Sequence, residues 1–345
     1  EIAATRLATL AHLATGKRAP TVVVASVNAF LQRVPVPETI AGSTLALAAG
    51  NVIATDDLMG FFARNGYGRV GTVRAPGDFA VRGGIVDLWP AGLEEPIRLD
   101  FFGDTLETIR TFDADSQKTT GQVKRLMLAP ASEVQLTEDT IRRFRREYVS
   151  LFGAVTGGDP LYEAVSAGQR HQGMEHWLPL FHAEMGTLAD HVPGAPVTLD
   201  FQAAEARDER IRDYRDYYDA RAAYDTGKGG IPAYRPVPPE RLYLDADEWE
   251  AVLADRRVRQ LHPHAMPESD TVIDLRGRPG RDFAPERRQE GTNVFNALVD
   301  HLKDLARGGR NVFVASYSEG ARERLTGLLK DHGAEIVVPV DRWEA

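Results

Sequence analysis

The segment at residues 83–104, GGIVDLWPAGLEEPIRLDFFGD, constrains the fold of this chain most strongly. Gly83-Gly84 and Gly103-Asp104 are turn pairs of the kind that close β-hairpins, and strand-forming residues lie between them. Along Ile97–Phe102 the side chains alternate, so that one face of the strand is apolar. The segment therefore predicts an antiparallel sheet with one buried face.

The opposite face of this predicted strand carries Arg98, Asp100 and Phe102. Arg82, near the end of the preceding strand, alternates to the outward face as well. An exposed aromatic side chain flanked by arginines is typical of protein interfaces. From the pattern alone, an ordinary surface on which a neighbouring loop covers Phe102 is an equally good interpretation.

Further strand and helix patterns flank this segment. Residues 43–131 are typical of a compact α+β module with an antiparallel sheet. Continuous apolar runs at residues 21–27 and 195–201 are typical of strands buried on both faces of a parallel sheet, so we expect the module to be inserted between two halves of one α/β domain. The Pro- and Gly-rich stretch 226–240 predicts a linker, and the segments TVIDLRG, NVFVASY and AEIVVPV beyond it predict strands of another α/β unit.

Composition narrows the class of protein. The 345-residue chain has a formal net charge of −9, which argues against a surface that binds nucleic acid all over but allows a local basic patch. It has no cysteine, which excludes disulfides and thiolate metal sites. No apolar run approaches the roughly 18 residues of a membrane span, and the chain begins in a helix pattern without Met or a signal peptide. We therefore expect a fragment of a longer cytoplasmic protein that does not bind a membrane.

Signatures of catalysis are incomplete. Asp200 lies at the carboxyl end of the strand predicted over residues 195–201, where an ATPase would hold magnesium, but the next residue is Phe201 and not the Glu that would orient water. Gly16-Lys17 and Gly227-Lys228 lack the rest of a P-loop. The histidines between 171 and 191 do not have the spacing of a zinc site. We predict that this chain has no catalytic residue, metal site or cofactor.

Four segments resemble the amino-terminal region of the bacterial transcription-repair coupling factors, the Mfd family: VVVASVNAFLQRV, GYGRVGTVRAPGDFAVRGGIVDLWP, IRLDFFGDTLETIRTFDADSQ and GMEHWLPLFH. The first three also resemble the excision-repair protein UvrB. The resemblance implies an α/β fold in which a degenerate helicase-like (RecA-like) domain, residues 1–43 and 132–232, is interrupted by an inserted α+β domain at 44–131. A linker and a third α/β domain would occupy residues 233–345.

The resemblance also implies a function. In this family the inserted domain docks on UvrA, and the docking residues correspond to Arg82, Arg98 and Phe102. Asp200-Phe201 stands where UvrB-like proteins carry Asp-Glu, which implies a lost ATPase. The chain would then be a non-catalytic adaptor that recruits UvrA to stalled RNA polymerase in nucleotide excision repair. The alternative is a fragment of a UvrB-type ATP-dependent helicase that verifies DNA damage.

The resemblance places the motor activity outside this chain. The full-length protein would be an ATP-dependent DNA translocase that uses ATP and magnesium. It would bind RNA polymerase and double-stranded DNA, whereas this fragment is expected to bind UvrA.

Overall fold

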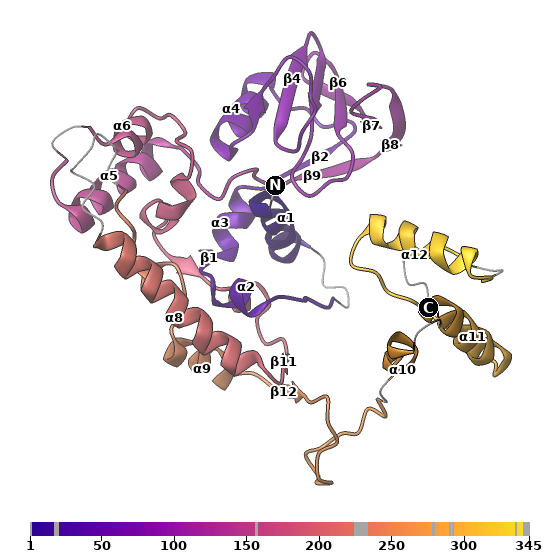
Figure 1. Cartoon of the computed structure of the whole chain (residues 1–345). Coiled ribbons are helices and arrows are strands. Elements are labelled where there is room, and N and C mark those ends of the chain that lie inside the picture. The colour runs from indigo at the N-terminus through magenta and orange to yellow at the C-terminus, as the bar shows by residue number, and fades with distance from the viewer. Residues whose placement is uncertain are drawn as a thin grey trace. The chain divides into compact units, whose positions relative to one another are not determined.

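The computed structural model describes residues 2–16, 21–155, 158–223, 234–277, 280–289, 291, 293–334 and 337–340. The chain divides into two compact units, Glu1–His264 and Ala265–Ala345, and the first contains both helices and sheets (Figure 1). The mixed α/β class predicted from the sequence is thereby confirmed. Among the described residues, no helix combines the length and the apolar character needed to cross a membrane.

A six-stranded sheet with the order β3-β4-β5-β6-β7-β8 forms the middle of the first unit. Its strands are β3 (Gly68–Arg69), β4 (Asp78–Arg82), β5 (Ile85–Leu88), β6 (Ile97–Phe102), β7 (Thr105–Phe112) and β8 (Thr119–Val123). Only β3 and β4 pair in parallel; the other neighbours are antiparallel, as predicted. Gly83 and Gly103 have φ values of 61° and 57° in the turns after β4 and β6, a conformation that glycine adopts without steric cost.

One face of this sheet packs against helix α4 (Thr55–Asn65) and against the antiparallel pair β2 (Leu45–Ala48) and β9 (Arg125–Leu128) (Figure 1). Leu58, Phe61 and Phe62 recur at helical spacing on α4 and are buried. From β6, Ile97 and Leu99 join the same core. Because burying one such side chain contributes about 1.5–3 kcal/mol, this core fixes which face of β6 points outward.

Helices that precede and follow the sheet domain in the sequence complete the first unit. They are α1 (Ile2–Thr15), α2 (Val27–Leu31), α3 (Pro37–Gly42), α5 (Glu138–Phe152), α6 (Pro160–Ser166), α7 (Leu188–His191), α8 (Ala203–Ala222) and α9 (Ala246–Ala254), with the 3-10 turns Met174–Leu180 and Pro239–Arg241. Two short sheets join them: β1 (Val34–Pro35) with β10 (Met185–Gly186), and β11 (Val197–Asp200) with β12 (Val258–Leu261). Strand β1, which precedes the sheet domain in the sequence, thus pairs with β10, which follows it by more than fifty residues.

The strand predicted over residues 21–27 is not formed, and this interpretation was wrong. Residues 21–26 are irregular and helix α2 starts at Val27, capped by Ser26, whose Oγ accepts from the Ala29 amide at 3.3 Å. Val22 and Val24 are 88% and 92% exposed. An apolar run becomes a strand only where another strand pairs with its backbone, and among the described residues no strand pairs with this one. The expected parallel sheet that joins this run to β11 is therefore absent from the described part of the chain.

The predicted linker at 226–240 is only partly described, because residues 224–233 lie outside the described ranges. The remainder contacts the first unit: Val237 is buried, and the Trp177 Nε1–H donates to the Arg235 carbonyl oxygen at 2.8 Å. Residues 246–261, which follow it, form α9 and β12 of the same unit. The domain boundaries assigned from the sequence, and the helicase-like arrangement, stay predictions.

The second unit contains α10 (Ala284–Arg288), α11 (Val294–Arg307) and α12 (Glu319–Asp331). The hydroxyl of Ser318 caps α12, because it accepts from the amide of Ala321 at 3.2 Å. The strands predicted at 271–277, 311–317 and 334–340 are not formed in their described residues, and Ile273 and Phe313 are 69% and 59% exposed. Here too the strand pattern was misread, because local sequence cannot supply the pairing that a strand requires.

Candidate protein-docking face

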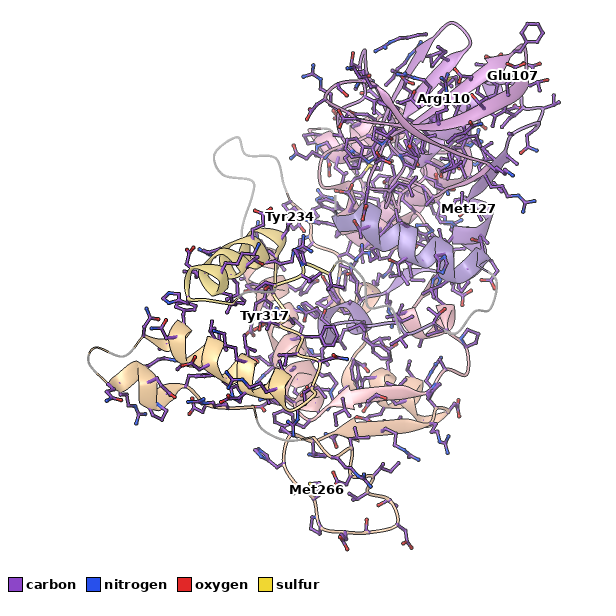
Figure 2. The ribbon with its side chains drawn as sticks, turned by 90° about the vertical axis from the view of Figure 1, so that its right-hand side faces the viewer. Glu107, Arg110, Met127, Tyr234, Met266 and Tyr317 are labelled. Carbon is purple, nitrogen blue, oxygen red and sulfur yellow. The ribbon has the colours of Figure 1, made fainter. Side chains whose placement is uncertain are left out.

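The outward face of the six-stranded sheet contains the side chains that the sequence pattern placed there. Arg98 lies opposite Asp87 of β5 and Arg110 of β7, and Asp100 lies opposite Ile85 and Thr108. The register shifts beyond Asp100 because β7 carries one extra residue, Glu107. Figure 2 labels Arg110 and Glu107 on this domain. The extra residue belongs to β7, so the alternation along β6 continues to its end.

The three residues predicted to dock a partner share this face but differ in accessibility. Phe102 is 79% exposed, whereas the side chains of Arg82 and Arg98 are 49% and 17% exposed. Arg82 lies two strands from β6, at the level of Asp100. With strand spacings of about 4.8 Å and a rise of about 3.3 Å per residue, the three Cα atoms span roughly 13 Å by 10 Å. This cluster of Arg82, Arg98 and Phe102 is called the docking face below.

A buried carboxylate lies between the two arginines. Asp87 is 2% exposed, and its Oδ1 and Oδ2 accept from Arg98 Nε at 2.7 Å and Nη2 at 2.9 Å. Nη1 of Arg82 is 4.0 Å from Asp87 Oδ2, and its Nη2 donates to the Gly71 carbonyl oxygen at 2.7 Å and to Thr72 Oγ1 at 3.1 Å. The hydrogen bonds that Arg98 donates to the Asp87 carboxylate raise the pKa of the Arg98 guanidinium, against the opposing effect of burial.

The rest of the face supports this arrangement. The Arg98 guanidinium carbon lies 4.7 Å from the ring centroid of Phe112, a cation–π contact. Phe112 is buried with Val73 and Ala80 in a small second core on this side of the sheet. Next to it, the carboxylate of Asp100 pairs with Arg110. The face is therefore an ordered surface, with charged pairs beside an apolar patch.

Sequence reasoning missed Asp87. The alternation in GGIVDLW already places Asp87 with Ile85 on the face opposite to Val86 and Leu88. That Arg98 is its partner depends on the register of β5 against β6, two strands joined by an eight-residue connection, and the sequence does not specify this register. The outward orientation was readable in the sequence, whereas the ion pair was not.

Asp200 and Phe201, predicted from the sequence to be a degenerate ATPase (Walker B) position, lie elsewhere in the first unit, at the end of β11. Asp200 is exposed, and its Oδ1 accepts from the amide of Gln202 at 3.0 Å. Phe201 is 41% exposed and offers no group that could orient water. Of the partial P-loop sequences, Lys17 and Gly227-Lys228 lie outside the described residues.

The four histidines of residues 171–191 do not converge. Each has its own hydrogen-bond partner: His171 the Gln172 carbonyl oxygen, His176 the Tyr234 hydroxyl, His182 the Glu133 carbonyl oxygen and His191 the Pro35 carbonyl oxygen. Within the described ranges, no group of His, Asp and Glu is arranged to hold a metal ion. These histidines contribute to local structure.

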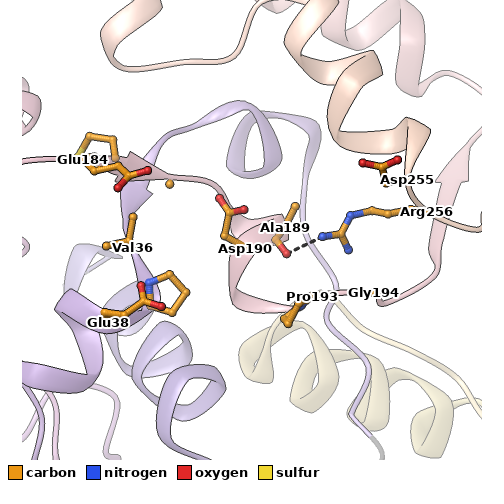
Figure 3. A pocket seen from close by; sticks show the side chains of 12 residues that line it. Val36, Glu38, Glu184, Ala189, Asp190, Pro193, Gly194, Asp255 and Arg256 are labelled. Carbon is orange, nitrogen blue, oxygen red and sulfur yellow. Dashed lines mark hydrogen bonds between the residues drawn. The ribbon is translucent and has the colours of Figure 1, made fainter.

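A pocket of about 430 Å³ lies in the first unit between α3, α7 and the turn before β12 (Figure 3). Four carboxylates line it, from Glu38, Glu184, Asp190 and Asp255. The one cation in its lining, Arg256, donates to the carbonyl oxygens of Ala189 at 2.7 Å, drawn as a dashed line, and of Val192 at 2.9 Å. The four carboxylates would repel the phosphates of a nucleotide, so this pocket does not suit ATP.

Comparison with known proteins relates the sheet domain to one family. The profile of the UvrB interaction domain matches residues 45–134. The transcription-repair-coupling factors of Haemophilus influenzae and Escherichia coli are each 31% identical over 95% of this chain. That of Bacillus subtilis is 23% identical over 98% of it. The chain spans only about 28% of the length of the first two relatives and 29% of the third.

Proposed function

We propose a function from the premise that this chain belongs to the transcription-repair-coupling factor family, in its UvrB-homology region. The chain is proposed to be a non-catalytic adaptor of the bacterial cytoplasm that recruits UvrA to stalled RNA polymerase for nucleotide excision repair. The sheet domain carries the matched interaction domain, so the contact with UvrA is assigned to the docking face.

The observation that carries this proposal is the exposed ring of Phe102 on the same face of the sheet as Arg82. The ring is 79% exposed at the end of β6, on the face away from the core. Burial of such a ring in a partner contributes about 1.5–3 kcal/mol, and aromatic and arginine side chains are the commonest energetic centres of interfaces. Arg82, two strands away on the same face, supplies a half-exposed cation, which selects a partner with a carboxylate in that position.

An adaptor is favoured over a damage-verifying helicase because of Asp200 and Phe201. A UvrB-type ATPase requires a carboxylate after the magnesium-binding Asp, and this chain has an aromatic ring there. The longer protein is proposed to be an ATP-dependent DNA translocase whose motor uses ATP and magnesium and binds RNA polymerase and double-stranded DNA. Those activities are assigned to the parts of its relatives that this chain does not span.

A competition experiment tests the proposal. Purified chain is immobilised, UvrA is bound to it, and UvrB is titrated in while UvrA release is followed by biolayer interferometry. If the chain and UvrB use the same type of interaction domain, UvrB displaces UvrA from the chain. Absence of UvrA binding, or a ternary complex in which UvrB and the chain occupy UvrA together without competition, would refute the proposal.

A further inference from the structure

We infer that Asp87 is the positioning residue of the docking face: it orders Arg82 and Arg98 so that both guanidiniums are already in place when the partner arrives. The inference rests on the proposed function for its consequence in binding. Asp87 is 2% exposed and so does not itself reach a partner. Asp87 affects binding through Arg82 and Arg98, which contact its carboxylate.

The geometry at Arg98 leaves little freedom. Both oxygens of Asp87 accept from this guanidinium, in the two-bond arrangement that is the most directional for Arg and carboxylate. Phe112 lies under the same guanidinium at 4.7 Å. A buried carboxylate without a partner costs free energy. Rotation of Arg98 away from Asp87 would leave such a carboxylate, so Asp87 holds Arg98 in this orientation. Nη1 of Arg98 is not part of this pair of hydrogen bonds.

Arg82 is held from two sides. Its Nη1 lies 4.0 Å from Asp87 Oδ2, and its Nη2 donates to the Gly71 carbonyl oxygen and to Thr72 Oγ1 in the loop before β4. A free arginine loses several rotamers when it binds, which weakens association. Because Asp87 and the loop already restrict Arg82, less entropy is lost at the interface.

The charges also indicate the partner chemistry. Two guanidiniums share the single carboxylate of Asp87, while Asp100 is paired with Arg110. The docking face therefore retains one positive charge, on the same side of the sheet as the exposed ring of Phe102. It fits a surface of UvrA that presents a carboxylate beside an apolar hollow.

Nuclear magnetic resonance of the arginine side chains tests the ordering without UvrA. In the intact chain the Arg98 Nε–H should exchange slowly with water, because it donates to buried Asp87. Asp87→Asn should speed this exchange by at least about tenfold while the backbone amide signals of the sheet persist. Unchanged exchange at Arg98 would overturn the inference. If Asp87→Asn unfolds the sheet, Asp87→Glu, which keeps the charge but moves it by one methylene, is expected to show the same selective effect.

Binding to UvrA tests the consequence. Asp87→Asn should weaken binding by about tenfold in the otherwise unchanged chain, but by less than about twofold when Arg82 and Arg98 are already alanine. The matched control is Asp100→Asn, the same substitution at the carboxylate that holds Arg110, with an expected loss below about threefold.

Two outcomes of the binding measurement would overturn the inference. An equal loss from Asp87→Asn in both backgrounds would show that Asp87 does not act through the arginines. An equal loss from Asp100→Asn would assign the effect to the general charge of the face. If the unchanged chain does not bind UvrA, the proposed function fails, whereas the exchange measurement still decides whether Asp87 orders Arg98.

Discussion

Replacement of Arg98 by alanine should destabilise the six-stranded sheet, although Arg98 was predicted from the sequence to lie outside the core. Arg98 pairs with both oxygens of Asp87, which is 2% exposed. Breaking a buried ion pair from one side costs about 3–5 kcal/mol. Arg82 remains 4.0 Å from Asp87 as a partial partner, so the lower end of this range, about 3 kcal/mol, is expected.

The other two residues of the docking face should behave differently. Phe102 is 79% exposed, so Phe102→Ala should change the free energy of unfolding by less than about 0.5 kcal/mol. The side chain of Arg82 is 49% exposed, and Arg82→Ala should cost about 1 kcal/mol or less. Stability and docking are therefore separable within one cluster of three residues.

Hydrogen exchange followed by mass spectrometry measures the loss of stability locally, in peptides from β5 and β6. A thermal melt of the whole chain would instead mix the unfolding of its two units. A loss of about 3 kcal/mol corresponds to exchange roughly a hundredfold faster in Arg98→Ala. As a control, Asp87→Ala added to Arg98→Ala should recover part of the protection, because no buried charge is then left unpaired. Protection equal to that of the unchanged chain in Arg98→Ala, or an equal loss in Phe102→Ala, would refute this reasoning.

Three further predictions concern other parts of the chain. Burial lowers the pKa of His182, whose Nε2–H donates to the Glu133 carbonyl oxygen at 3.0 Å. The unfolded state then takes up a proton more readily, so local stability should fall as the pH drops below about 6.5. His182→Gln should flatten the pH dependence of hydrogen-exchange protection in the peptides around residue 182, and an unchanged pH dependence would contradict this. Phe144 is fully buried and stacks on Phe181 with a centroid distance of 4.7 Å, so Phe144→Ala should cost about 3–5 kcal/mol in urea unfolding, and a cost below about 1 kcal/mol would contradict the packing. The chain should not release phosphate from ATP, and Phe201→Glu should not create that activity; turnover abolished by Asp200→Asn would show that the site is active.

What the sequence could predict is local. The alternation along β6 and the glycine turns depend on neighbouring residues alone, and they placed Phe102 on the outward face, where it lies. The pairing of Asp87 with Arg98 depends on how two strands align, and Arg98 therefore appeared more accessible in the sequence than its 17% exposed side chain shows.

Strand predictions held only where the fold supplies a pairing partner from a distant part of the chain. The apolar run at residues 21–27 has the composition of a buried strand, but Val22 and Val24 are exposed because no described strand pairs with it. The strand over residues 195–201 was found as β11, Val197–Asp200, where residues 258–261 supply a parallel neighbour, but it is not buried on both faces, because Thr198 and Asp200 are exposed. Composition predicts the tendency to form a strand, whereas the pairing decides it.

Titration calorimetry with UvrA, using the unchanged chain, Phe102→Ala and Met127→Ala, tests the role of the docking face most directly. Met127 is an apolar residue of the same domain that is 46% exposed, but it lies on β9, where its sulfur contacts Thr15 of α1 (Figure 2). Loss of an exposed aromatic anchor should cost about 2 kcal/mol or more, so Phe102→Ala should raise the Kd at least tenfold while Met127→Ala leaves it within about twofold. An unchanged Kd for folded Phe102→Ala would place the UvrA contact elsewhere on the molecule.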